Sequence, residues 1–276
     1  MLKKQHLLFL FVMLAMPLAA SADTPAGIAK LSAAQIIEKN VAARGGLAAW
    51  RAVQGITMTG KIDAGGNRDR ANFPMPEDEK ASGLPPQRLK DQVQLPFVLE
   101  LKRPRKSRLE IQFAGQTAIQ VYDGTNGWKL RPFLNRHEVE PFSAEELKAA
   151  SLQADLDGPL VDYAAKGTKI ELDGTENVEG HNTYRLKLTM KNGQEERIWV
   201  DAATFLEVKI DGTPRRLDGR FHAVAIYYRD YRPISGLMVP HVLETVVDGV
   251  KDHEKIQIES VTLNPKLEDS RFAKLQ

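Results

Sequence analysis

The sequence predicts a mainly β protein with a few helices, built as one strongly curved antiparallel sheet or unclosed β-barrel of about eleven strands with a helical lid or plug. Residues 97–133 hold four segments of alternating apolar and polar residues, separated only by short turns. Residues 168–264 hold a second and longer series, whereas helical periodicity is confined to two stretches near 31–53 and 143–165. Because many antiparallel strands twist and curl, they should enclose an apolar interior that so few helices fill only in part.

The first 22 residues are typical of a cleaved secretory signal. Lys3 and Lys4 precede a short apolar run over residues 7–18, and small side chains end at Ala22. The run is shorter than the roughly 20 residues that span a bilayer, so cleavage after Ala22 is favoured over an uncleaved membrane anchor. We therefore expect a periplasmic protein with a single half-barrel domain over residues 23–276.

Composition excludes several classes of protein and site. The chain has no cysteine, which excludes a lipid-modified bacterial lipoprotein, disulfides and thiolate metal sites. The formal net charge of +2 falls to about zero when Lys3 and Lys4 leave with the signal, so nucleic acid is not an expected partner. The stability of the mature chain must come from an apolar core.

The first element after the signal is a helix that Ser32 caps. Apolar residues recur at helical spacing up to a glycine pair at 45–46, where a left-handed C-terminal cap is expected, and residues 47–50 predict one further helical turn. Residues 55–62 alternate as a first strand. Residues 63–94 contain four prolines and little apolar periodicity, which predicts a long, polar and mobile loop.

The first series of strands predicts which side chains face the interior. Alternation places the following residues on the inner face and makes them candidates for lining a hydrophobic cavity: Leu99, Leu101, Leu109, Ile111, Phe113 and Val121. The same alternation turns a polar set toward water: Glu100, Lys102, Glu110 and Gln112.

Two aromatic positions extend the set of cavity candidates. Trp128 follows an Asp-Gly turn and is interpreted as a core or rim aromatic, with ligand contact as the alternative. Tyr227 and Tyr231 share a parity while Tyr228 faces the other way, so at most one of these two sets lines the interior. We take Tyr227 as the candidate.

The second half of the chain begins with helical signals and continues as strands. Ser143–Glu146 is a capping box that opens a helix through about Gln153, and residues 157–165 predict a second short helix, which Gly167 ends. Glycine and Asx turns then separate the remaining predicted strands. These strands are 168–174, 182–190, 195–202, 205–212, 221–231, 237–249 and 255–264.

No pattern of residues points to catalysis or to metal binding. The six histidines show no metal-ligand spacing, no serine lies in a nucleophile motif, and the acidic residues are spread along strand edges and turns. Strand pairing could bring His222 and His241 together, although surface or strand-face positions are the better interpretation. We expect no catalytic residues, no metal, no cofactor and no enzymatic activity.

A basic cluster lies on the turn between the first two strands of the first series. Its members are Arg103, Arg105, Lys106 and Arg108. The cluster is either a solvated turn that protects the sheet edge or a patch that meets lipid headgroups or an acidic partner. Arg215, Arg216 and Arg220 form a similar but weaker cluster.

Five segments, spread over nearly the whole mature chain, carry a resemblance to a known family. They are Ala42–Gly60, Leu99–Phe113, Tyr122–Trp128, Ile226–Thr245 and Val261–Leu275, the last ending in an Asp-Ser-x-Phe turn. In this order they resemble the LolA/LolB-like superfamily of outer-membrane lipoprotein-sorting proteins. The resemblance implies an unclosed β-barrel with a helical lid that binds acyl chains of lipoproteins or other lipids for transfer across the periplasm.

The function expected from this resemblance is that of a periplasmic carrier or chaperone that moves a lipoprotein or other lipid toward the outer membrane. Its expected partners are the acyl chains of its cargo, an inner-membrane exporter and an outer-membrane acceptor, and it should act as a monomer. The alternative is a periplasmic sensor of lipids or lipoproteins that has the same fold and signals to a membrane partner. A hydrolase is disfavoured because no nucleophile motif is present.

Overall fold

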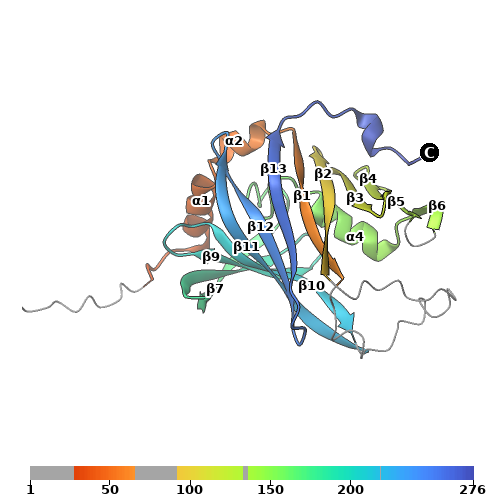
Figure 1. Ribbon diagram of the computed structural model, residues 1–276. Coiled ribbons are helices and arrows are strands. Elements are labelled where there is room, and N and C mark those ends of the chain that lie inside the picture. Colours follow the sequence, from red (N-terminus) through yellow and green to blue (C-terminus); the bar gives the residue numbers. More distant parts are fainter. Residues whose placement is uncertain (1–27, 66–91, 133–135, 218) are drawn as a thin grey trace, which may run out of the picture.

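The computed structural model describes residues 28–65, 92–132, 136–217 and 219–276 (Figure 1). The expected signal at 1–22 and residues 66–91 of the expected loop lie outside these ranges. Residues 63–65 and 92–94 belong to strands, so the expectation of a loop over 63–94 was wrong at both margins. Among the described residues, no helix combines the length and the apolar character that crossing a membrane requires.

The described residues form one antiparallel sheet of thirteen strands, in the order β6-β5-β4-β3-β2-β1-β13-β12-β11-β10-β9-β8-β7. The sheet is strongly curved and is not closed into a barrel, as the sequence predicted, because β6 and β7 remain as edges (Figure 1). The strands of its first half are β1 (Gly55–Gly65), β2 (Gln92–Lys102), β3 (Lys106–Phe113), β4 (Gln116–Tyr122), β5 (Gly127–Arg131) and β6 (Arg136–Pro141). Those of its second half are β7 (Lys169–Val178), β8 (His181–Thr189), β9 (Glu195–Asp201), β10 (Glu207–Leu217), β11 (Arg220–Ile234), β12 (Leu237–Val247) and β13 (Glu254–Leu263).

Local capping chemistry sets the bounds of the two longer helices. Helix α1 (Ala33–Ala43) begins with a capping box in which the Ser32 hydroxyl accepts from the Gln35 amide and the Gln35 side chain accepts from the Ser32 amide. Helix α4 (Ala144–Gln153) begins with the same arrangement between Ser143 and Glu146. A short helix, α2 (Leu47–Ala52), follows α1 directly.

The helix expected over residues 157–165 is absent, and this prediction was wrong. The 154–167 segment instead runs as a series of turns, with positive φ at Gly158 and at Asp162. A residue with φ of 52°, such as Asp162, interrupts the right-handed helical conformation. Asp157, at the start of the expected helix, and Asp162, in its middle, instead form long-range ion pairs with Arg103 and Arg51.

Strand register shows that the helices cover one face of the sheet, which we call the inner face. Leu99 pairs with both Met58 and Leu109, and paired residues of antiparallel strands point to the same side. Following the paired residues from strand to strand shows that Tyr184 of β8 lies on the same side of the sheet as Leu99. Tyr184 packs in one cluster with Ile36 and Ile37 of α1, so the helices lie on this side.

Two apolar clusters fill most of the space under the helices. In the first, α1 packs on β8, β9 and β10, with Leu160 of the 154–167 segment fully buried among them. In the second, Trp50 of α2 packs with Leu156 and Val161 of the same segment against β1, β2 and β12. The 154–167 segment therefore contributes to both clusters and joins them. A smaller cluster lies between α4 and Tyr122 of β4.

The opposite, outer face of the first strands is covered by the C-terminus. A 3-10 turn, η3 (Asp269–Phe272), packs on β3, and Phe272 is 1% exposed. Arg271 donates from Nε to the Glu100 carboxylate at 2.7 Å, and its carbonyl accepts from Arg108 at 3.1 Å. Both faces of this part of the sheet are thus shielded, which alternation alone did not indicate.

Candidate functional site

The inner face carries a row of apolar side chains that the helices leave partly exposed. These residues lie on β1, β2, β3, β12 and β13 and belong to none of the buried clusters. We call them the open stripe: Ile62, Leu95, Leu109, Ile111, Leu243 and Ile256. Register joins four of them side by side, since Ile62 pairs with Leu95 and Ile256, and Ile256 pairs with Leu243. Leu109 and Ile111 of β3 pair with Leu99 and with buried Phe97 of β2.

The open stripe lies toward one end of the sheet. Ile62 is three residues from the end of β1 at Gly65, and Ile256 is two residues from the start of β13 at Glu254. At the other end of the same strands, α2 and the 154–167 segment close the interior with buried residues such as Trp50. The inner face is therefore packed at one end and partly open at the other.

Five of the predicted cavity residues lie on the inner face, but they differ in surroundings. Leu101 is buried in the second apolar cluster and Leu99 is packed against that cluster. Leu109 and Ile111 belong to the open stripe, and Phe113 is partly exposed at the end of β3. The stripe residues of β1, β12 and β13 were not predicted as cavity residues, although the alternation of Ile256 and Ile258 indicated an apolar face there.

Val121, Trp128 and Tyr227 lie on the outer face, so placing them on the inner face was wrong. Val121 pairs with Arg108 and with Trp128, whereas the inner-face residue Leu109 pairs with Gln120. Tyr227 pairs with Lys209 and Glu244, while its neighbour Tyr228 pairs with Leu243 of the open stripe. Tyr228, rather than Tyr227, faces inward, and Tyr231 of the same strand also reaches the inner side, where its hydroxyl donates to buried Glu207.

The expectation that the polar set faces water was correct only for part of it. Gln112 is exposed, and Lys102 and Glu110 are partly exposed. Glu100 is 6% exposed because the C-terminal turn lies over it, and the Arg271 guanidinium compensates its charge.

The basic cluster does not form one continuous patch. Arg103 turns inward, Lys106 lies 3.1 Å from the Asp269 carboxylate, and Arg108 bonds to Glu110 and to the Arg271 carbonyl. Arg105 is the exposed member of the cluster. The other three are engaged by the protein itself.

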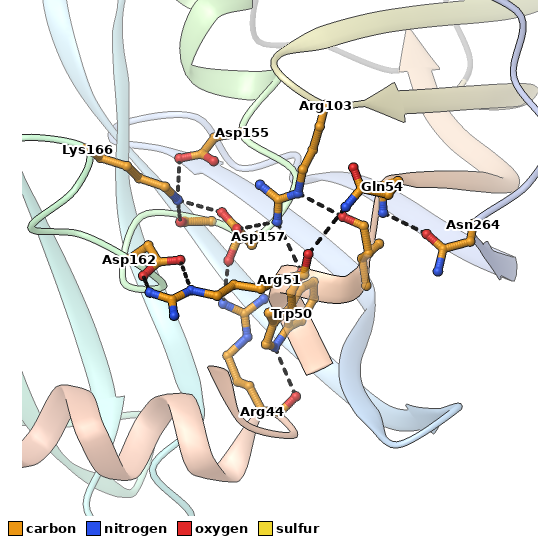
Figure 2. Close-up of polar contacts among 12 residues, drawn as sticks. Arg44, Trp50, Arg51, Gln54, Arg103, Asp155, Asp157, Asp162, Lys166 and Asn264 are labelled. Carbon is orange, nitrogen blue, oxygen red and sulfur yellow. Dashed lines mark hydrogen bonds and ion pairs between the residues drawn. The ribbon is translucent and has the colours of Figure 1, made fainter. Parts of the chain in front are cut away.

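Arg103 belongs to a buried polar cluster at the packed end of the interior (Figure 2). Its Nη2 donates to Asp157 Oδ2 at 2.6 Å and to the Trp50 carbonyl at 3.1 Å, and its Nε donates to the Val53 carbonyl at 2.8 Å. Lys166 donates to Asp157 Oδ1 at 2.5 Å and lies 2.8 Å from Asp155. These contacts fix the 154–167 segment to the end of α2 and to the turn after β2.

Arg44, at the C-terminal end of α1, extends the cluster to the second half of the sheet. Its Nη1 donates to the Asp157 carbonyl at 2.9 Å and to Glu207 at 3.2 Å, and its guanidinium lies 4.4 Å from the centre of the Trp50 ring. Tyr231 donates to the other oxygen of Glu207 at 3.2 Å. Arg44 and Glu207 are both buried, so neither charge would be tolerated without the other.

The neighbours of the two aspartates shift their pKa values in opposite directions. Burial alone would raise the pKa of Asp157, but hydrogen bonds from Lys166 and Arg103 outweigh burial and lower it. For Asp155, burial dominates over the attraction of Lys166 and raises the pKa. The cluster therefore favours the charged form of Asp157 more strongly than that of Asp155.

Two pockets stand out in the described part of the chain, and neither is lined by the open stripe. One, of about 190 Å³, lies beside the buried polar cluster and is lined by Arg103, Pro104, Arg105, Ala154, Asp155, Leu156 and Lys166. The other, of about 440 Å³, is an open hollow around the turn between β3 and β4. Among the residues described, no group of three or more histidine or acidic side chains could hold a metal ion.

No protein-family model matches this sequence, and no curated protein matches it significantly. Solved structures do match the fold. A LolA superfamily protein from Nitrosomonas europaea is 16% identical with a TM-score of 0.53, covering 89% of this chain and 99% of that one. A putative outer membrane lipoprotein-sorting protein domain from Vibrio parahaemolyticus is 11% identical with a TM-score of 0.53, covering 87% and 95%. A DUF1329 family protein from Desulfovibrio piger is 14% identical with a TM-score of 0.55, covering 87% and 96%. Together with the unclosed thirteen-stranded sheet, these matches show that the chain has a LolA-like fold.

Proposed function

We propose that this protein is a periplasmic carrier that binds the acyl chains of a lipoprotein or another lipid along the open stripe and brings them toward the outer membrane. The observation that carries the proposal is the stripe itself. Its six apolar side chains lie on the concave, helix-covered face of a curved sheet and yet remain partly exposed. Partly exposed apolar side chains gathered on a concave face in this way are a feature of ligand-binding grooves.

The physical gain in such a carrier is the burial of apolar surface. Each Å² of apolar area removed from water contributes about 25 cal/mol, so an acyl chain laid on the stripe would shield both itself and the stripe residues. No charged side chain belongs to the stripe, so a tail could lie there without displacing an ion pair. We propose binding, rather than catalysis, as the function.

The LolA-like fold supports an acyl cargo in general, and the expected signal over residues 1–22 supports a periplasmic location. A carrier in that compartment would take its cargo from an inner-membrane exporter and pass it to an outer-membrane acceptor. We propose that it does so as a monomer.

The experiment is native mass spectrometry, with lipid extraction, of the mature chain purified from a periplasm. The proposal requires a bound lipid or lipoprotein acyl chain near one per chain, and displacement of that ligand by a fluorescent fatty acid. A lipid-free protein that co-purifies with a membrane protein would instead favour the sensor of the same fold. A protein that carries no lipid and takes up no fatty acid would contradict both functions.

A further inference from the structure

The hairpin between β10 and β11 projects beyond the rest of the sheet. The pairing of β11 with β12 starts at Val224, and the pairing of β10 with β9 stops at Ile210. The two strands nevertheless stay paired with each other as far as Leu217 and Arg220. The outer part of this hairpin is therefore a two-stranded projection at the end of the sheet that also holds the β12–β13 turn (Figure 1).

The neighbouring β12–β13 hairpin braces the projection as far as the last residue of β10. Leu217 packs against a small buried cluster of three valines, Val224, Val247 and Val250. Arg215 makes a two-pronged ion pair with Glu254 at the start of β13, with N–O distances of 2.8 and 2.7 Å. A free two-stranded hairpin is marginally stable in water, so these contacts with the β12–β13 hairpin stabilise the projection.

The tip combines the most exposed large apolar side chain of the described residues with two unpaired cations. Phe221 is 76% exposed, against 42% for Leu172 and 36% for Leu47, the other large apolar residues that are exposed there. Arg216 pairs with Phe221 across the hairpin, and Arg220 precedes it. Both arginines are exposed, and within the described chain neither has an ion pair or a side-chain hydrogen bond. Counting Asp218, which lies outside the described residues, the sequence of the tip remains net positive.

We propose that this tip docks the protein on an anionic lipid membrane, with Phe221 entering the interface and Arg216 and Arg220 contacting the headgroups. An aromatic side chain beside arginines is the composition that binds such interfaces. A protein partner fits less well, since a stable protein interface buries about 800 Å² on each side and the narrow tip of one hairpin offers far less.

The role of this docking rests on the proposed carrier function. The strands that carry the open stripe end at the same end of the sheet as the hairpin, because β1 runs toward Gly65, β12 toward Val247 and β10 toward Leu217. Docking by the tip would thus bring the open end of the inner face to the membrane, where an acyl chain is taken up or released. The packed end, with α2 and Arg103, would point away.

Vesicle co-sedimentation of the mature chain tests the proposal, with vesicles of phosphatidylcholine alone or with about 30% phosphatidylglycerol. We expect binding to the mixed vesicles that weakens about tenfold or more in Phe221→Ala. Arg216→Gln and Arg220→Gln should each weaken it about fivefold. Matched controls are Leu47→Ala and Arg105→Gln, exposed residues at the packed end, which should bind like the parent.

A second measurement distinguishes insertion of residue 221 into the bilayer from electrostatic binding to its surface. Phe221→Trp should show fluorescence quenching by brominated acyl chains that the parent, with Trp50, Trp128 and Trp199, does not show. Arg216, Arg220 and Phe221 are all exposed, so the melting temperatures of their variants should equal that of the parent. Equal loss of vesicle binding in the tip variants and in the controls would overturn the proposal. A Phe221→Trp variant that is not quenched by brominated acyl chains would also overturn it, as would a parent that binds only an acidic protein and no vesicles.

The outcome separates this inference from the proposed function. Fatty-acid uptake in the absence of vesicles should be unchanged by all tip variants. A parent that takes up fatty acid but ignores anionic vesicles would overturn the docking inference and leave the carrier function standing. A parent that binds vesicles through the tip but takes up no fatty acid would overturn the carrier function and leave the docking inference standing.

Discussion

Asp157 is 1% exposed, and yet its neighbours favour its charged form. Desolvation would disfavour that charge, but Arg103 and Lys166 each donate to a different oxygen of the carboxylate, which satisfies both. The two cations come from the β2–β3 turn and from the far end of the 154–167 segment, so one carboxylate ties together parts of the chain that are distant in sequence. Its removal would leave two buried or partly buried cations without their main partner.

Asp157→Asn should therefore lower the free energy of unfolding by about 3–5 kcal/mol, as expected when one member of a buried ion pair is lost. Asp162→Asn is the matched control, because Asp162 pairs with Arg51 at 2.6 Å on the surface of the same segment. An exposed pair contributes about 1 kcal/mol or less. Urea unfolding of both variants measures the difference. Equal losses would mean that burial of Asp157 does not decide its contribution.

The stability difference between the parent and Asp157→Asn should also depend on pH. The folded-state pKa of Asp157 lies below its ordinary value of 3.8, so the native state binds fewer protons than the unfolded state in this range. Its contribution to stability is present above pH 4 or so and is lost as the pH falls through the folded pKa. The stability gap between the parent and Asp157→Asn should thus narrow as the pH falls below about 4. A gap that widened on acidification would contradict the direction of the shift.

At the scale of elements, local signals predicted the pieces that local chemistry determines. The capping boxes at Ser32 and Ser143 set the start of α1 and α4 where the sequence placed them. Glycine turns at hairpin spacing likewise predicted β8, β9, β12 and β13 within a few residues, whereas the strand expected to end at Gly212 continues to Leu217 as β10. In both cases the stabilising contacts lie within a few positions along the chain, so a sequence read without tertiary structure contains them.

The elements that were missed depend on distant partners. Residues 157–165 resembled a capped helix, yet Asp157 bonds to Arg103 and Asp162 to Arg51, and these contacts replace the helical conformation. Strand β6 was not predicted because it is an edge strand with no fully buried side chain, which leaves it without the alternation that marks other strands.

The C-terminal turn shows the same limit in another form. The sequence indicated a closing Asp-Ser-x-Phe turn but not the surface on which it packs, which is the outer face of β3. Phe272→Ala should lower the free energy of unfolding by about 3–5 kcal/mol, because a fully buried phenylalanine leaves a cavity. Lys274→Ala, an exposed change two residues on, should have little effect. Chemical unfolding of the two variants decides this, and a loss below about 1 kcal/mol for Phe272→Ala would show that the turn is not part of the cooperative fold.

At the scale of the whole molecule, the sequence was enough to predict the fold class. It was not enough to predict which residues of every strand point to the inner face. The error at Val121 arose from the length of one turn. A three-residue turn at 114–116 would pair Phe113 with Thr117 and place Val121 beside Leu109, but the observed two-residue turn pairs Phe113 with Gln116. A shift of one residue moves every side chain of a strand to the other face, so β4 and β5 present the opposite set from the one expected.

Ile111 and Val121 therefore lie on opposite faces of the sheet. Ile111 belongs to the open stripe and is partly exposed, whereas Val121 is 0% exposed on the outer face. A tryptophan at Ile111 should fill space above the stripe, weaken uptake of a fluorescent fatty acid on the order of tenfold and change the melting temperature little. A tryptophan at Val121 overpacks a closed site and should cost about 1–3 kcal/mol of stability while leaving uptake intact in the folded fraction. Thermal melting and probe titration of both variants separate these effects. Loss of stability in both, with no uptake by the parent, would mean that the inner face is ordinary core and that the carrier function is wrong.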